Sequence, residues 1–176
     1  MKDKLMHSYK SNYFDDDDGN IYEGQSLNGK IHGKGKCTFK NGDIYEGDWA
    51  YGKIHGKGKY TFENGDTYEG DWVNDHMHGI GIYRYTSGDS YEGYFKDSTR
   101  YGKGIFKYGK GDVYIGNFKE DRSHGKGKYI YKSGSVYVGQ YRNDKRNGKG
   151  KFTTANGLVY DGFFEDGVYV GKNGFV

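Results

Sequence analysis

Four histidines recur at one spacing and are the first candidates for metal chemistry. His32, His55 and His78 are 23 residues apart, and His124 falls two such intervals further on. If each interval holds two strands about 4.8 Å apart, successive histidines are separated by about 9–10 Å. Ligands of one zinc ion must each lie about 2 Å from it, so these side chains cannot share an ion. We therefore expect structural histidines, no metal and no other cofactor.

Three other segments resemble functional motifs but lack residues that the chemistry requires. The Gly-Lys-Gly-Lys sequence at 56–59 does not end a phosphate-binding loop or open a helix. The acidic run 15–18 lacks the glycine and glutamate spacing of a calcium loop and is expected to form a turn. The single cysteine, Cys37, occupies a position that is aromatic in other repeats and is expected to fill the core. Because no nucleophile–base arrangement is found either, the sequence predicts that the protein is not an enzyme.

The composition excludes several classes of protein. An aromatic content of 18% is too high for a disordered chain. No run of about 18 apolar residues is available to cross a membrane, and residues 1–7 contain no apolar stretch of a signal peptide. A net charge of +3 is too small to favour nucleic-acid binding. We expect a cytoplasmic protein.

The chain repeats itself every 23 residues, and this period determines the predicted fold. A tyrosine opens each interval, and positions within the repeat are counted from it as position 0. These tyrosines are Tyr22, Tyr45, Tyr68, Tyr91, Tyr114, Tyr137 and Tyr160. Positions 2, 11 and 20 are glycine, as is position 13 in most units. We predict an N-terminal tail at 1–12, a lead-in strand of a hairpin at 13–21, six repeats at 22–159 and a partial capping repeat at 160–176.

Each repeat contains two segments with the alternation typical of β-strands. Positions 0–4 and 11–17, for example 45–49 and 56–62, alternate with a period of two and show no helical period. Asn-Gly and Asp-Gly dipeptides, which favour hairpin turns, separate many of these segments. The sequence therefore predicts an all-β protein that forms an elongated, single-layer antiparallel meander of repeated hairpins.

The turn between repeats determines which side chains share a face. A three-residue turn at 64–66, with Gly65 at positive φ, places Phe62 beside Tyr68 and Tyr60 beside Gly70. All large aromatic side chains then lie on one face, and lysine, glutamate and threonine lie on the other. We expect the glycines at positions 2, 11 and 13 to leave room for rings, supplied mainly by position 4.

The repeat Tyr-Glu-Gly-Asp-Trp-x5-His-Gly-Lys-Gly-Lys-Tyr-Thr-Phe-x-Asn-Gly-Asp resembles the MORN repeat (membrane occupation and recognition nexus). Units 22–44 and 45–67 match best. The resemblance implies a twisted single-layer sheet with a groove on its aromatic side. It also implies a non-catalytic module, because members act as cytoskeletal scaffolds, junctional tethers, binders of myosin tails, or repeat arrays attached to phosphatidylinositol phosphate kinases. A place at the cytoplasmic face of a membrane or at the cytoskeleton follows from the same resemblance.

Our first functional interpretation is a scaffold or adaptor that binds a protein partner along the aromatic groove. A one-layer sheet cannot cover both of its faces, so we expect the stripe of rings to stay partly exposed and to hold a helix or an extended segment. The resemblance implies a cytoskeletal or motor protein as the partner. The predicted groove residues are Tyr45, Trp49, Tyr68, Trp72, Tyr91, Phe95, Tyr114 and Phe118.

The alternative is a peripheral membrane module that binds anionic lipid or phosphoinositide, or a regulatory module related to the phosphatidylinositol phosphate kinases. Residues 91–159 carry 15 Lys and Arg against 6 Asp and Glu, a net charge of +9. Each cation near acidic lipid contributes about 1 kcal/mol. The predicted lipid-binding residues are Lys103, Lys107, Lys126, Lys128, Lys145, Arg146 and Lys149.

The C-terminal end suggests self-association as well. The tail 163–176 is rich in phenylalanine and valine, and the last strand of a meander exposes unpaired backbone groups. We therefore predict a homodimer formed through the C-terminal end.

Overall fold

The computed structural model describes residues 10–15 and 18–173, and side chains from residue 18 onward. Every regular element in these ranges is a β-strand, which confirms the predicted all-β class. None of the described residues belongs to a helix long and apolar enough to span a bilayer. The chain divides into two compact units, residues 1–79 and 80–176, which are treated separately below.

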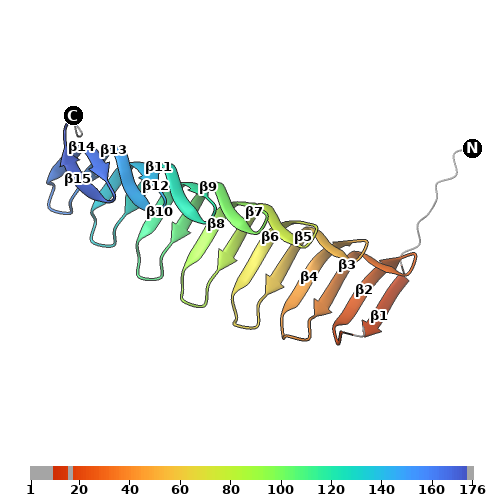
Figure 1. Ribbon diagram of the computed structural model, residues 1–176. Helices are drawn as coiled ribbons and strands as arrows, with labels where there is room; N and C mark the ends of the chain where they lie inside the picture. The colour runs from red at the N-terminus through yellow and green to blue at the C-terminus, as the bar shows by residue number, and fades with distance from the viewer. Residues whose placement is uncertain (1–9, 16–17, 174–176) are drawn as a thin grey trace, which may run out of the picture. The chain divides into compact units, whose positions relative to one another are not determined.

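Consecutive strands pair with one another in antiparallel fashion inside each unit (Figure 1). The strands of the first unit are β1 (Lys10–Asp15), β2 (Ile21–Leu27), β3 (Lys30–Thr38), β4 (Ile44–Ala50), β5 (Lys53–Thr61) and β6 (Thr67–Val73), and β7 (His76–Arg84) contains the boundary. Those of the second unit are β8 (Ser90–Lys96), β9 (Thr99–Lys107), β10 (Val113–Lys119), β11 (Arg122–Ile130), β12 (Val136–Arg142), β13 (Lys145–Thr153), β14 (Val159–Glu165) and β15 (Val168–Gly171). Each unit is thus the predicted single-layer meander, and the lead-in strand β1 begins at Lys10.

The hairpin inside each repeat turns on two residues in the left-handed region, the type I′ geometry. Asn143 (φ 50°) and Asp144 (φ 67°) connect β12 to β13 in this way. The second turn residue also bonds to the preceding repeat, because Asp144 donates its N–H to the carbonyl of Ser123 and its Oδ1 accepts from the N–H of Ser123 at 2.7 Å. These bonds offset the cost of a residue other than glycine at positive φ.

A bulge, which we call the wide bulge, follows the paired glycines of the hairpins β2–β3, β4–β5, β8–β9, β10–β11 and β12–β13. β4 and β5 are in register at Gly47 and Gly58, but then residues 55–57 all stand opposite Asp48. Gly56 lies in this bulge with φ 68°, and an added Cβ would meet the Asp48 side chain. The glycine at position 11 is therefore needed for the backbone conformation of the bulge. Our expectation that it leaves room for a ring was wrong.

The glycines at positions 2 and 13 do leave room for a ring, and the ring comes from position 0. The side chain of Tyr45 lies over Gly47 and Gly58, so that a Cβ on either glycine would overlap the tyrosine. Its hydroxyl donates to the carbonyl of Asp48 at 3.0 Å. The same hydroxyl-to-carbonyl bond, three residues along the chain, is made by Tyr22, Tyr68, Tyr91, Tyr114 and Tyr137.

The connection between repeats is a three-residue loop that begins one residue earlier than predicted. Phe62 donates its N–H to the carbonyl of Asp66, and Gly65 donates to the carbonyl of Phe62, both at 2.9 Å. The loop is therefore 63–65, and Gly65 has the expected positive φ of 86°.

The predicted strand register is consequently wrong by two residues. Tyr60 stands opposite Tyr68, where Gly70 was expected, and Lys59 stands opposite Glu69. Because side chains alternate with a period of two, an even error leaves every residue on its predicted face. The aromatic face and the charged face are thus as predicted, although the individual pairs differ.

A buried aspartate at position 21 explains the shift. Asp43 is only 9% exposed, and its two oxygens accept from the N–H of Glu63 at 2.8 Å and from the hydroxyl of Tyr60 at 2.7 Å. Asp112 bonds in the same way to the following repeat. This side chain ties one repeat to the next, so it belongs to the paired backbone and not to the turn.

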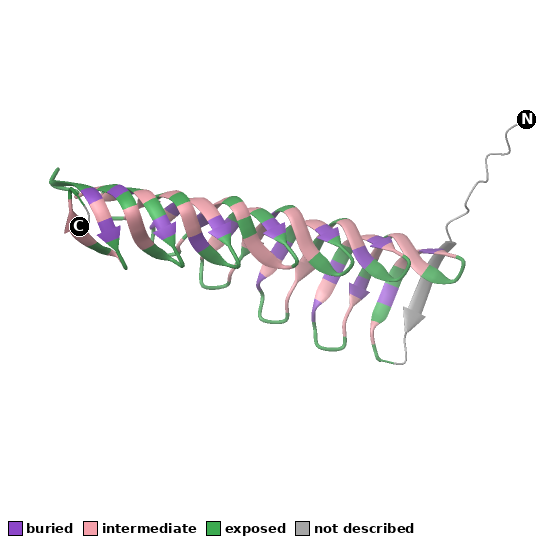
Figure 2. Cartoon of the chain, turned by 45° about the horizontal axis from the view of Figure 1, so that its top comes forward, coloured by how far each residue is buried: buried purple, intermediate pink, exposed green. Residues whose placement is uncertain are grey.

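The core consists mainly of rings at positions 0 and 4. Tyr45 contacts Trp49 and Trp72 edge to face, with ring centroids 5.1 and 5.5 Å apart. The indole nitrogen of Trp49 donates to the carbonyl of Gly35 at 3.2 Å, one repeat earlier. Buried residues consequently fall mainly along the strands, where they alternate with exposed ones, and the turns of each unit are mostly exposed (Figure 2).

We expect Gly58→Ala to destabilise the protein by about 3 kcal/mol, because the new methyl group overlaps the Tyr45 ring. Gly52→Ala is the control, because Gly52 has open space around it, so that an added side chain meets only the strain of its positive φ (87°). Its cost should be about 1 kcal/mol. Urea unfolding of both variants measures the difference, and equal costs would contradict the proposed packing.

The buried tyrosines predict a steep loss of stability in alkali. Burial raises the pKa of Tyr22 and of Tyr137 to about 12, from an ordinary value of 10.0. The neutral hydroxyl is favoured in the folded state, so this stabilisation is present below pH 10 and is lost as the pH rises through about 12. We expect part of the tyrosinate absorbance to appear only together with the loss of the β-sheet circular dichroism signal. Complete ionisation of all tyrosines before that loss would contradict the prediction.

Candidate functional site

The eight predicted groove residues form the core of the sheet. Each of them is at most 6% exposed, so the expectation that these rings stay partly exposed was wrong. The reason is that the rings of Tyr45, Tyr91 and Tyr114 lie over bare glycine backbone and contact a position-4 ring on either side. The residues concerned are Tyr45, Trp49, Tyr68, Trp72, Tyr91, Phe95, Tyr114 and Phe118. Their role in partner binding stays a prediction, and rings at other positions are more accessible.

On the aromatic face, the rings at positions 15 and 17 are on the whole less buried than the core rings, and we call them the ring ladder. Most of these rings are half-buried, and successive rings lie 4.4–6.0 Å apart between centroids. In the first unit the ladder is Phe39, Tyr60 and Phe62, and in the second it is Tyr83, Tyr85, Phe106, Tyr108, Tyr129, Tyr131 and Phe152.

Buried aspartates fix two tyrosines of the ring ladder. Tyr129 donates its hydroxyl to Asp112 Oδ2 at 2.8 Å, as Tyr60 does to Asp43. Burial and this bond raise the pKa of the Tyr129 hydroxyl. The N–H of Lys132 and the Tyr129 hydroxyl together hold the pKa of Asp112 below its ordinary value. These two tyrosines are therefore held in place within the ladder.

Two arginines, Arg146 and Arg100, lie over the aromatic face of the second unit. Arg146 was among the predicted residues, but Arg100 was not. Its guanidinium lies 5.0 Å from the Phe106 ring centroid and is held by Asp121 through Nε at 3.0 Å. Arg146 lies 5.2 Å from the ring centroids of Phe152 and Phe164. The available signal was the arginine at position 9 in two repeats, where the other four have isoleucine, methionine or serine.

The seven predicted lipid-binding residues do not form one strip. Arg146 lies over the aromatic rings, and Lys145 pairs with Asp166 at 3.6 Å. The opposite face carries Lys103, Lys107, Lys126, Lys128 and Lys149. Four of these five line two hollows on that face, and Lys107 does not.

The repeated histidines occupy the wide bulges. The Nδ1 of His32 accepts from the N–H of Tyr51 at 3.3 Å. Those of His55 and His124 are buried without a hydrogen-bond partner in the described part of the chain. Among all the residues that the structure describes, no group of three His, Cys, Asp or Glu side chains could hold a metal ion.

The remaining features singled out in the sequence are Cys37, the acidic run and the C-terminal end. Cys37 is buried, at 4% exposure, as expected for a core position. Of the acidic run 15–18, residues 16 and 17 lie outside the described residues, so its role stays a prediction. At the C-terminal end, Phe164 is buried against Tyr169 with centroids 5.3 Å apart, and residues 174–176 lie outside the described residues.

Comparison with known proteins identifies the repeat. The TCP domain of SAS-4 (dCPAP) of Drosophila melanogaster, solved with a proline-rich motif of Ana2 (dSTIL), is 16% identical over 85% of this chain and 86% of that chain, with a TM-score of 0.49. The TCP10 domain of Danio rerio CPAP, solved with a STIL peptide, is 13% identical over 85% and 97%, with a TM-score of 0.27. These TM-scores are too low for an argument about function, and no curated protein matches the chain.

The family model described as the MORN repeat matches six consecutive segments, 22–44, 45–67, 68–90, 91–113, 114–136 and 137–159. Since these matches cover most of the chain, the protein belongs to the MORN-repeat family.

Proposed function

We propose that the protein is a non-catalytic interaction module that binds an apolar segment of a partner protein along the ring ladder. The observation that carries this proposal is the series of half-buried rings in the second unit, in which each ring contacts the next from Tyr83 to Phe152. Aromatic side chains of this kind dominate the energy of protein interfaces because they bury a large area at a small cost in conformational entropy.

The chemistry of the repeat supports a binding module over an enzyme. Its tyrosine hydroxyls and aspartate carboxylates bond to backbone groups or to one another, as Tyr45 and Asp43 do, and its histidines lie in the bulges. These groups hold one repeat to the next. The cytoskeletal and membrane-associated setting that the family resemblance implies stays a prediction.

The anionic-membrane alternative has weaker support. The cations predicted for it are divided between two faces, and two of them are engaged with Asp166 or with aromatic rings. A membrane surface contacts one face at a time, so a divided set of cations loses much of its combined attraction.

The ring ladder can be tested with peptides selected from a displayed random library against the full chain. We expect the selected peptides to be rich in apolar residues and to lose at least tenfold in affinity with Tyr108→Ser plus Tyr131→Ser. Tyr51→Ser plus Tyr101→Ser is the matched control, because both tyrosines are exposed and lie outside the ladder. Isothermal titration calorimetry of the three proteins measures the affinities, and thermal unfolding checks that each variant is folded.

Two results would contradict the proposal. One is that the selected peptides bind the ladder variant as tightly as the natural sequence. The other is that the control variant loses as much affinity as the ladder variant, which would show that the tyrosines act through solubility or general surface chemistry.

A further inference from the structure

The face opposite the ring ladder carries paired charges in the first unit. Lys34 and Lys57 each reach the aspartate 14 residues further along the chain, with Nζ 2.6 Å from an Oδ1 of Asp48 and Asp71. Lys59 stands between two glutamates on neighbouring strands. Every lysine in these positions therefore has an acidic neighbour that neutralises it.

In the second unit Lys103, Lys126, Lys128 and Lys149 keep these positions, but their cross-strand acidic neighbours are gone. The residues 14 places after Lys103, Lys126 and Lys149 are asparagine, glutamine and phenylalanine. Lys128 stands between Ile115 on β10 and Val138 on β12, where Lys59 has its two glutamates. Among the described residues of this unit, none of the four lysines forms an ion pair. The substitutions leave uncompensated positive charge beside apolar side chains.

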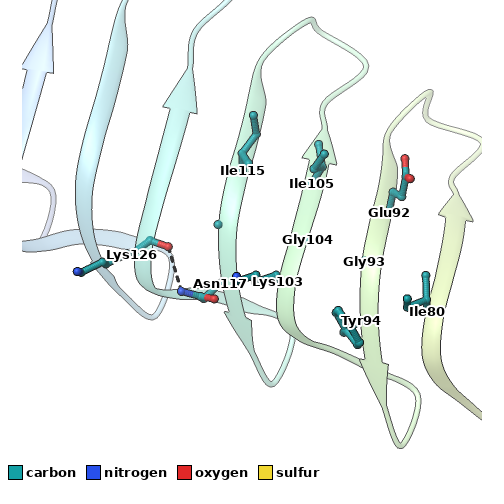
Figure 3. A pocket seen from close by; sticks show the side chains of 11 residues that line it. Ile80, Glu92, Gly93, Tyr94, Lys103, Gly104, Ile105, Ile115, Asn117 and Lys126 are labelled. Atoms are coloured by element: carbon teal, nitrogen blue, oxygen red, sulfur yellow. Dashed lines mark hydrogen bonds between the residues drawn. The ribbon is translucent and has the colours of Figure 1, made fainter.

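These residues line two adjoining hollows. One has a volume of about 560 Å³ and is lined by Ile80, Tyr94, Ile105 and Lys103, with one carboxylate, Glu92, opposite Ile105 (Figure 3). The other has a volume of about 470 Å³ and is lined by Lys128, Val138 and Lys149. Ile115 and Lys126 line both, so the hollows form one groove, which we call the lysine groove. Each volume lies in the range of ligand-binding pockets.

The apolar side chains of the lysine groove are unusually exposed for a β-sheet surface. Ile80 is 53% exposed, Ile115 is 41% and Val138 is 52%. Such side chains gain from being covered, and the lysines beside them gain from carboxylates. The complementary ligand therefore combines apolar and acidic side chains.

We propose that the lysine groove binds an extended acidic segment of a partner protein in which carboxylates alternate with apolar side chains. Strands β7 to β13 contribute to the groove, so at about 4.8 Å per strand it is about 29 Å long. An extended segment of about nine residues covers that distance. This surface is separate from the ring ladder, and the proposal does not depend on the function proposed above.

A peptide fits this surface better than a lipid bilayer does. A bilayer is broad and contacts groups that protrude, whereas here the isoleucines line hollows bordered by lysines. A single chain can place its apolar side chains in the hollows and its carboxylates beside the lysine ammonium groups at the same time. The bilayer remains one outcome of the test.

The probe is a fluorescein-labelled peptide of nine residues in which glutamate or aspartate alternates with valine or isoleucine. Fluorescence anisotropy with the full chain at about 0.15 M salt should show saturable binding that weakens as salt is added. Two matched peptides are the controls, one with amides in place of the acids and one with serine in place of the apolar residues. We expect each control peptide to bind at least tenfold more weakly. If the amide peptide binds as tightly as the acidic one, the proposal is overturned.

Protein variants then locate the site. Lys126→Glu plus Lys128→Glu should weaken binding of the acidic peptide at least tenfold. Lys119→Glu plus Lys132→Glu changes the net charge equally at exposed sites outside the groove and should have little effect. The ladder variant Tyr108→Ser plus Tyr131→Ser should bind the acidic peptide normally, which separates this proposal from the previous one. Thermal unfolding of each variant confirms that it is folded.

Three further results would overturn the proposal. The first is no peptide binding at millimolar concentration. The second is an equal loss with both lysine pairs, which would indicate net charge alone. The third is that vesicles containing phosphatidylserine bind the chain, release it on Lys126→Glu plus Lys128→Glu and are not displaced by the peptide, which would assign the groove to membranes.

Discussion

The contact between a tyrosine ring and two facing glycines is the interaction on which each unit depends. Sheets normally bury one face against a second layer, and here the buried layer is made of the sheet's own rings. Tyr45 can approach the backbone because Gly47 and Gly58 have no side chain, and its hydroxyl then reaches the carbonyl of Asp48. This arrangement makes a compact core possible with a hydrophobic content of only 33%.

Because packing uses one face only, the other face can change its chemistry without disturbing the fold. Lys59 and Lys128 occupy the same place in the repeat, yet one stands between glutamates and the other between Ile115 and Val138. A charged pair on an exposed sheet surface contributes little to stability, about 0–1 kcal/mol. Replacing such a pair therefore changes the free energy of unfolding only slightly. Differences between repeats on this face therefore point to ligand chemistry more directly than the invariant rings do.

The sequence predicted the period, the strands and the two faces, because these depend on spacing and alternation alone. It did not predict the register, since that depends on whether Asp66 and its equivalents belong to a turn or to the paired backbone, and their burial is a tertiary effect. The wide bulges were missed for a related reason: Gly56 has the same residue type as Gly58, although one serves backbone geometry and the other ring packing. The rings were correctly placed on one face, but which of them are accessible depends on the glycines beneath them.

The bonds that join neighbouring repeats have a consequence for how the chain acquires its structure. Asp43 with Glu63 and Asp144 with Ser123 link residues only 20 or 21 apart in the sequence. Short loops of this kind close quickly and lose little entropy in closing. Each hairpin can therefore add to the preceding one as the chain leaves the ribosome, before the following repeats have been synthesised.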